Sequence, residues 1–240
     1  MQMNVYKTDA ISDLLKAKSY PGRGIVIGKS ADGQSAVFAY FIMGRSENSR
    51  NRVFVEKEGA IFTEPHDYSK VSDPSLIIYS AIREISDKVI VTNGDQTDTI
   101  YDAISRGGDM REALRTREFE PDAPNLTPRI SGVLSFDGGY SYEMSILKSS
   151  DPEGAGCNRY FYEYTPISGL GHFLHTYIDD GNPLPTFSGE PERVLIPNSI
   201  DELADGIWTS LNPENKISLY IRYINIETGK SESRLFNKNK

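Results

Sequence analysis

A short polar turn between a strand and a helix has residue types that bind small ligands. Residues 89–92 read Val-Ile-Val-Thr and predict a buried strand. Asn93 and Gly94 follow, and since both tolerate a positive φ the chain is expected to turn sharply there. Asp95 is placed to cap a helix whose first turn holds Thr97. Amides and polar side chains at such a corner commonly bind ligands, although plain turn chemistry explains the same pattern.

Four arginines stand at predicted strand ends. Arg23 starts the first strand, Arg45 and Arg52 flank a polar loop between two strands, and Arg129 opens a later one. In a chain of net charge −8, guanidinium groups among Gly, Ser and Asn suit a small anion such as a phosphate. The alternative is a solvated loop with ion pairs of little energetic consequence.

Other catalytic signatures are weak. The sequence contains no Gly-x-x-x-x-Gly-Lys loop and no G-x-G-x-x-G before a helix, so common nucleotide-binding folds gain no support. His172 and His175 are three residues apart and would face opposite sides of a strand, which argues against a metal site. Cys157 has no base nearby in sequence, so a structural thiol is expected.

Composition narrows the class of protein. The 240 residues are 38% hydrophobic, enough for a folded core, and the pI near 5.0 disfavours nucleic acid and anionic membranes as partners. No apolar run approaches the ~20 residues of a membrane span. The first residues, 1–4, do not have the pattern of a signal peptide. With a single cysteine, no intramolecular disulfide can form, and a cytoplasmic location is expected.

Hydrophobic periodicity predicts an α+β fold. Residues 1–20 contain a short helix and are expected to be an N-terminal helical extension of a single domain over residues 21–240. Strands are predicted at 24–28, 35–43, 53–55, 60–62, 76–85, 89–92, 129–135, 142–148, 160–166, 173–178, 217–226 and 231–236, and helices after Asp95, Asp109 and Ser199. Residues 36–42 lack polar alternation, as in a strand covered on both faces, so two β layers covered by helices are expected.

Four short motifs occur in a fixed order. They are Gly22-Arg23, Arg45-Ser46 with Asn51-Arg52, residues 93–98 (Asn-Gly-Asp-Gln-Thr-Asp), and Thr127-Pro128-Arg129-Ile130. Together they resemble the archaeal-type IMP cyclohydrolase family and its bacterial relatives. The resemblance covers residues 20–129 by motif and extends more loosely to residue 176.

The resemblance implies both a fold and a reaction. The fold would be a four-layer αββα sandwich resembling the N-terminal-nucleophile hydrolases. The reaction would close formylated aminoimidazole carboxamide ribonucleotide to inosine monophosphate (IMP) with loss of water, the last step of purine synthesis. The implied partner is a small-molecule purine ribonucleotide, and no cofactor or metal is expected. The oligomeric state, including a homo-oligomer, is left open by the sequence.

The resemblance also implies roles for individual residues. Arg23, Asn93 and Asp95 would be catalytic, whereas substrate binding would fall to Arg45, Ser46, Asn51, Arg52, Gly94, Thr97 and Arg129. The arginines would contact the phosphate or the formyl oxygen, while Asn93 and Asp95 would contact the carboxamide or ribose. The sequence does not identify the catalytic acid, nor does it choose between Tyr40 and Tyr164 for stacking or proton transfer.

The chain departs from the family pattern at Gln96, where archaeal members have a histidine. Glutamine does not exchange protons at neutral pH, so an acid–base role at this position would be lost. Two other functions stay open. One is a purine nucleotide-binding protein without catalysis, and the other an N-terminal-nucleophile-type amide hydrolase, which needs Ser, Thr or Cys exposed at the chain start.

Overall fold

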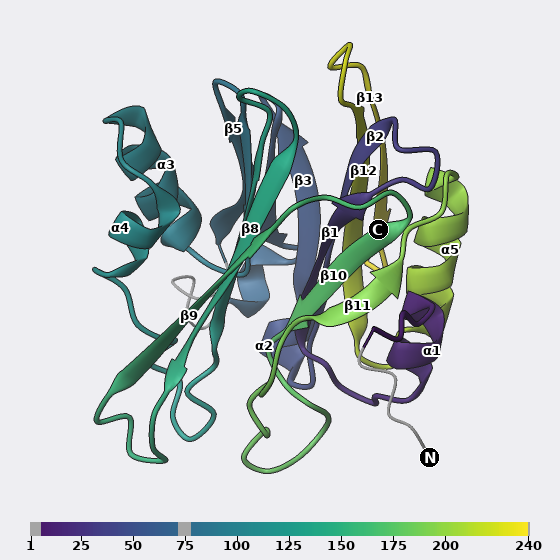
Figure 1. Cartoon of the computed structure of the whole chain (residues 1–240). Coiled ribbons are helices and arrows are strands. Elements are labelled where there is room, and N and C mark those ends of the chain that lie inside the picture. The colour runs from purple at the N-terminus through teal and green to yellow at the C-terminus, as the bar shows by residue number, and fades with distance from the viewer. Residues whose placement is uncertain (1–5, 72–77, 240) are drawn as a thin grey trace.

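The computed structural model describes residues 6–71 and 78–239, whose strands form two sheets (Figure 1). The six-stranded sheet has the order β11 (Glu192–Leu195), β10 (Leu170–His175), β1 (Arg23–Lys29), β2 (Ser35–Met43), β12 (Lys216–Asn225), β13 (Ser231–Asn237). The seven-stranded sheet has the order β3 (Arg52–Lys57), β4 (Ala60–Pro65), β5 (Tyr79–Ile85), β6 (Lys88–Thr92), β7 (Arg129–Ser135), β8 (Ser141–Ser149), β9 (Cys157–Tyr164). The predicted α+β class is confirmed.

Helices lie on the outer side of each sheet (Figure 1). α1 (Ile11–Lys16) and α5 (Ile200–Ser210) cover the six-stranded sheet, whereas α3 (Gln96–Ser105) and α4 (Met110–Leu114) cover the seven-stranded one. The caps predicted for α4 and α5 are present, because the Asp109 and Ser199 side chains accept from backbone amides in the first turn. The short helices α2 (Glu47–Arg50) and η1 (Tyr68–Lys70) were not predicted.

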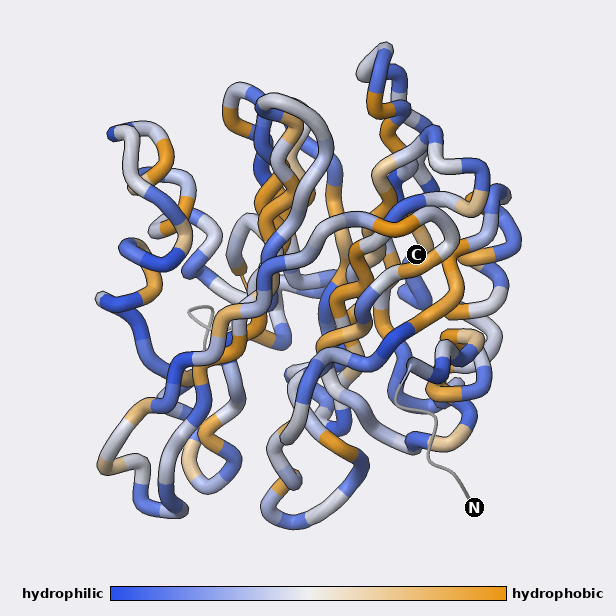
Figure 2. Tube along the Cα trace, in the orientation of Figure 1, coloured by the Kyte–Doolittle hydropathy of each residue, from blue (hydrophilic) through white to orange (hydrophobic). Residues whose placement is uncertain are grey.

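The main core lies between the sheets, and strand alternation explains how it forms. On β1, Ile25 and Ile27 face the other sheet, whereas Val26 between them packs under α1 and α5. Every residue of β2 from Ala36 to Met43 is buried for the same reason. Burying one such aliphatic side chain contributes about 1.5–3 kcal/mol. Figure 2 shows hydrophobic segments concentrated in the strands where the two sheets face each other.

Two predictions near the C-terminal half were wrong. The strand expected at 173–178 is β10, which ends at His175, and β11 lies in a stretch for which no element was predicted. β11 has only four residues at the edge of its sheet, and its hydrogen bonds to β10 rather than side-chain alternation define it. Of the strand predicted at 76–85, residues 79–85 form β5, while residues 76 and 77 lie outside the described part.

The N-terminal segment packs closely on the main body. Ile11 and Leu15 of α1 join the core formed with α5, and the Asp179 carboxylate accepts from the backbone amides of Ser19 and Tyr20. The division at residue 20 stays a prediction. In the described ranges, no helix is long and apolar enough to cross a membrane.

Candidate functional site

The corner after β6 is fixed by buried side chains. The Oδ1 of Asn93 accepts from the Ile130 amide (2.8 Å) and from Gln96 Nε2 (3.0 Å), and its Nδ2 donates to the Pro128 carbonyl (2.9 Å). The Thr97 hydroxyl is 2.6 Å from that of Thr92. We call Thr92, Asn93, Gln96 and Thr97 the latch, because their bonds hold the corner together and, through Asn93 and Gln96, join it to β7.

Gly94 is required for space rather than for backbone conformation. Neither Asn93 nor Gly94 has a positive φ, so the predicted reason for this turn was wrong. A Cβ on Gly94 would instead lie 2.6 Å from Arg129 Nη1 and 2.8 Å from Glu120 Oε1. The glycine therefore lets two charged groups pack against the backbone of the corner.

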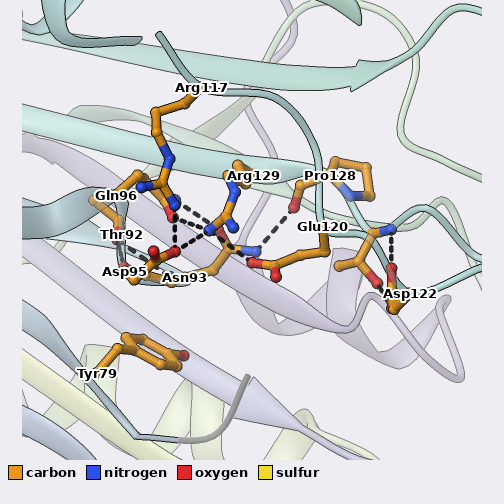
Figure 3. Close-up of polar contacts among 12 residues, drawn as sticks. Tyr79, Thr92, Asn93, Asp95, Gln96, Arg117, Glu120, Asp122, Pro128 and Arg129 are labelled. Atoms are coloured by element: carbon orange, nitrogen blue, oxygen red, sulfur yellow. Dashed lines mark hydrogen bonds and ion pairs between the residues drawn. The ribbon is translucent and has the colours of Figure 1, made fainter. Parts of the chain in front are cut away.

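An ion-pair network lies where these charged groups pack against the corner (Figure 3). Arg129 Nη1 lies 2.7 Å from Asp95 Oδ1 and 2.8 Å from Glu120 Oε1, and Arg117 Nη2 lies 2.5 Å from the same Asp95 oxygen. Burial acts to raise the pKa of Asp95, but its bonds to Arg117 and Arg129 outweigh this and lower it. Asp95 makes no side-chain cap to α3, contrary to the prediction. Its carboxylate instead holds the two arginines.

Glu120 has one paired and one unpaired oxygen. Its Oε2 is buried without a hydrogen-bond partner among the described residues. Burial raises the pKa of Glu120, and this prevails over the charges of Arg129 and Arg23, which lower it. A buried carboxyl group with a raised pKa and a free oxygen is suited to donate a proton.

Arg23 lies at the start of β1 among tyrosine rings. Its Nε is buried and has no acceptor within residues 6–71 and 78–239. Burial acts to lower the pKa of the guanidinium, but the nearby hydroxyls of Tyr177, Tyr20, Tyr79 and Tyr40 act in the opposite direction and prevail. Four tyrosines thus lie near a guanidinium whose Nε has no partner in the described part of the chain.

A second arginine is buried beside the first. Arg52 is 1% exposed, and burial followed by the charge of Arg23 lowers the pKa of its guanidinium. It donates only to the carbonyls of Ser49 (2.7 Å) and Met43 (3.2 Å), and in the described part of the chain neither arginine is paired with an acid. We call Arg23, Arg52, Tyr20, Tyr40, Tyr79 and Tyr177 the tyrosine–arginine cluster. A buried arginine beside a half-buried one, neither paired with an acid in the described residues, favours an anionic ligand.

Backbone conformation and close packing explain why a glycine, Gly22, precedes Arg23. Its φ is +78°, and a Cβ there would lie 2.3 Å from Thr176 Oγ1 and 2.5 Å from Tyr177 Cδ2. The end of β10 can approach β1 this closely only because Gly22 has no side chain. This approach brings Tyr177 to the cluster.

The other predicted binding residues lie at the rim or stabilise loops. Arg45 pairs with Asp180 and lies 5.2 Å from the centre of the Tyr20 ring. Ser46 caps α2 by accepting from the Ser49 amide. Asn51 bonds the backbone of Asp67 through both ends of its amide.

No sequence pattern selects Glu120, Tyr79 or Tyr177. Glu120 lies in an irregular loop, Tyr79 is the first residue of β5, and Tyr177 lies just after β10. The Tyr79 hydroxyl is 2.9 Å from that of Tyr40, one of the two predicted tyrosines. Tyr164, the other one, stacks on His172 with ring centres 3.6 Å apart and has no contact with Arg23. Only proximity in the fold connects Glu120, Tyr79 and Tyr177.

A separate cavity lies near one member of the tyrosine–arginine cluster. A cavity of about 1050 Å³ is lined by residues of β5 and α3 and reaches Tyr79, but its lining does not include Arg23 or Glu120. Within 6–71 and 78–239, no group of His, Cys, Asp and Glu could hold a metal ion. His172 bonds Tyr142 across the main core, whereas His175 bonds the Tyr177 carbonyl and Glu192, so the histidines are separate as predicted.

A buried cationic cluster beside a carboxyl group of raised pKa, set in a two-sheet α+β fold, has the features of an enzyme site for a small anionic substrate. A family model described as IMP cyclohydrolase-like protein matches residues 20–230. The chain belongs to this family, as its motifs predicted.

Relatives named IMP cyclohydrolase agree with this assignment. The one from Methanopyrus kandleri is 35% identical over 162 residues, which are 66% of this chain and 75% of the relative. That from Methanococcus aeolicus is 30% identical over 66% of this chain and 74% of its own length. The relative from Methanococcus maripaludis strain C7 is 34% identical over 55% of this chain and 65% of its own length.

Proposed function

We propose that this protein is an IMP cyclohydrolase, which closes formylated aminoimidazole carboxamide ribonucleotide to IMP and releases water. Its family and the names of its relatives support this activity. We place the reaction in the cytoplasm and in purine nucleotide synthesis. The purine ribonucleotide is the expected small-molecule partner.

The reaction sets clear demands on the site. The carboxamide nitrogen attacks the formyl carbon, and the formyl oxygen leaves as water. Two protons leave nitrogen atoms and two join that oxygen, so the overall reaction consumes no acid or base. The protein therefore has to hold the two ends of the substrate together, stabilise charge on the oxygen and move protons.

The observation that carries the proposal is that Arg23 and Glu120 each have a buried polar atom without a partner in the described residues. The two groups are near enough that the charge of Arg23 acts to lower the pKa of Glu120. In our proposal, Arg23 stabilises the charge that develops on the formyl oxygen, and Glu120 protonates that oxygen. Arg52 adds positive potential that attracts the nucleotide, and Arg45 contacts it at the rim.

The latch and its ion pairs have a positioning role in this proposal. The amide of Asn93 and the hydroxyl of Thr97 are used by backbone and neighbouring side chains. Asp95 orients Arg129, which in turn fixes one oxygen of Glu120. Gln96 donates to Asn93 and the Ile130 carbonyl and accepts from Arg129, so its task is structural and glutamine serves it well.

We further propose that the fold is the αββα sandwich of N-terminal-nucleophile hydrolases. The order of helices and sheets in Figure 1 supports this. A nucleophile at the chain start has no part in the proposed reaction, and residues 1–5 lie outside the described part.

The direct test is an assay of the purified protein with the formylated ribonucleotide. The expected result is an increase in purine absorbance well above the spontaneous rate, abolished by excess IMP. Tight IMP binding without acceleration would instead identify a nucleotide-binding protein without catalysis. If the protein neither accelerates the reaction nor binds IMP, both functions are rejected.

A further inference from the structure

A chain of hydrogen bonds leads from the tyrosine–arginine cluster towards the surface. The Tyr177 hydroxyl lies 2.5 Å from the Thr127 hydroxyl, which in turn donates to Asp122 Oδ2. The Thr127 amide donates to the other oxygen of Asp122 at 2.7 Å. Tyr177 is 1% exposed, whereas Asp122 is only half-buried, so the chain connects the interior with solvent.

The carboxylate fixes the direction of this chain. An ionised Asp122 can only accept, so the single proton of the Thr127 hydroxyl must be donated to it. The Thr127 oxygen then has no proton for Tyr177 and must accept the phenol proton. Consequently the Tyr177 oxygen presents lone pairs, rather than its proton, to any further neighbour. Burial raises the pKa of Tyr177 to about 12, so the phenol keeps its proton at neutral pH.

We propose that Tyr177, Thr127 and Asp122 form a proton relay that accepts the proton lost by the carboxamide nitrogen during ring closure. The inference rests on the proposed cyclohydrolase function and assigns the base of that reaction. No other residue of the proposed site has this role. Tyr177 touches the substrate and is catalytic, whereas Thr127 and Asp122 act through it and are positioning residues.

The transfer balances at each atom. As the new N–C bond forms, the π electrons of the formyl group move to its oxygen, which takes a proton from Glu120. The nitrogen proton passes to the Tyr177 oxygen, the phenol proton to Thr127, and the Thr127 proton to Asp122. Asp122 then releases its proton to solvent, and Glu120 is reprotonated from solvent. Glu120 gives this second proton to the hydroxyl group, which leaves as water, and the second nitrogen proton restores Glu120.

One loop provides both sides of this exchange. Glu120 donates its backbone amide to the Thr127 carbonyl at 2.8 Å, which closes the loop between them. The carboxyl group of Glu120 faces Arg129 and Arg23, whereas Asp122 and Thr127 face Tyr177. The proposed proton donor and the relay are thus held on two stretches of backbone that are joined to each other, and addition to a carbonyl requires both a donor and an acceptor of protons.

Three variants test the relay against a purely structural role. Thr127→Val removes the hydroxyl, Thr127→Ser keeps it, and Tyr177→Phe removes only the phenol oxygen while leaving the ring that stacks on Tyr20 at 6.0 Å. Each variant is assayed for kcat, KM, the solvent deuterium isotope effect on kcat, IMP affinity and thermal unfolding. We expect Val and Phe to lower kcat by about 10²-fold, with KM and IMP affinity within about threefold of wild type.

The serine variant is the matched control. It should retain kcat within about threefold and keep the multi-proton solvent isotope effect, which Val and Phe should reduce. Equal kcat in the Val, Ser and Phe variants, with an active wild type, would overturn the relay and leave the cyclohydrolase intact. A loss of kcat in the Val and Phe variants that follows only a loss of folded protein would overturn it too. An inactive wild type would reject the proposed function and the relay together.

Discussion

The latch and the tyrosine–arginine cluster are neighbours, yet they differ in whether their buried polar groups have hydrogen-bond partners. The side chains of Asn93, Gln96 and Thr97 in the latch have hydrogen-bond partners inside the protein. In and beside the cluster, the Nε of Arg23 and the Oε2 of Glu120 are buried without partners among the described residues. Folding alone penalises such unpaired groups, each by about 1–3 kcal/mol.

This difference separates stability from function. A buried network in which every polar group has a hydrogen-bond partner makes the structure around it rigid. A buried polar group without a partner can instead bind a ligand. The corner that looks most like a binding site in the sequence therefore supports the site, and the groups proposed to meet the substrate lie next to it. The following variants test this division.

The largest effect is expected from Glu120→Gln. The amide cannot donate the carboxyl proton, so kcat/KM should fall by about 10²- to 10⁴-fold. Because the pKa of Glu120 is raised above 4.5, wild-type activity should be complete below that raised pKa and decline as pH rises through it. The variant should lack this decline.

Glu118→Gln is the control for that variant, because the Glu118 side chain is 66% exposed. Its kcat/KM and pH profile should match wild type. If Glu120→Gln keeps full activity with an unchanged pH profile, another group is the acid.

Arg23→Met should separate binding from folding. The loss of its guanidinium is expected to weaken IMP binding at least about tenfold, or 1.4 kcal/mol, by calorimetry. Since Arg23 has no acid to leave unpaired, urea unfolding should show equal or higher stability. Arg106→Met, at an exposed helix end, should change neither quantity. Unchanged IMP affinity in Arg23→Met would remove the cluster from the site.

Asn93→Ala should act mainly on stability. It leaves the Pro128 carbonyl and the Ile130 amide without their partner, at a cost of about 1–3 kcal/mol in urea unfolding. Asn158→Ala, on the exposed side of β9, should be near neutral. A large fall in kcat at unchanged unfolding free energy would restore Asn93 to the catalytic role first predicted from sequence.

Gly94→Ala, like Asn93→Ala, should act mainly on stability. Its Cβ would displace Arg129, so thermal unfolding should report a loss of about 1–3 kcal/mol. Gly206→Ala in α5 meets no atom within 4 Å and should gain up to ~1 kcal/mol from helix propensity. Equal stability of the two variants would show that the close packing at Gly94 does not contribute to the stability of the fold.

Local patterns predicted much of the fold. The helix capped by Ser199 and the strand at 35–43 were correct because their apolar spacing is long and regular. The edge strand β11 was missed, since four residues carry no periodic signal. Arg23 and Arg52 were selected from sequence and lie together, whereas Arg45 is at the rim.

The sequence by itself determined the family, the α+β class and the presence of a polar corner among arginines, because these depend on short motifs and on hydrophobic spacing. Only the tertiary structure decided which polar atoms are satisfied. Glu120, Thr127 and Tyr177 become neighbours through the closed loop and the approach of β10 to β1 at Gly22. Whether a buried charge is paired depends on atoms brought together from distant parts of the chain, and no local pattern encodes that.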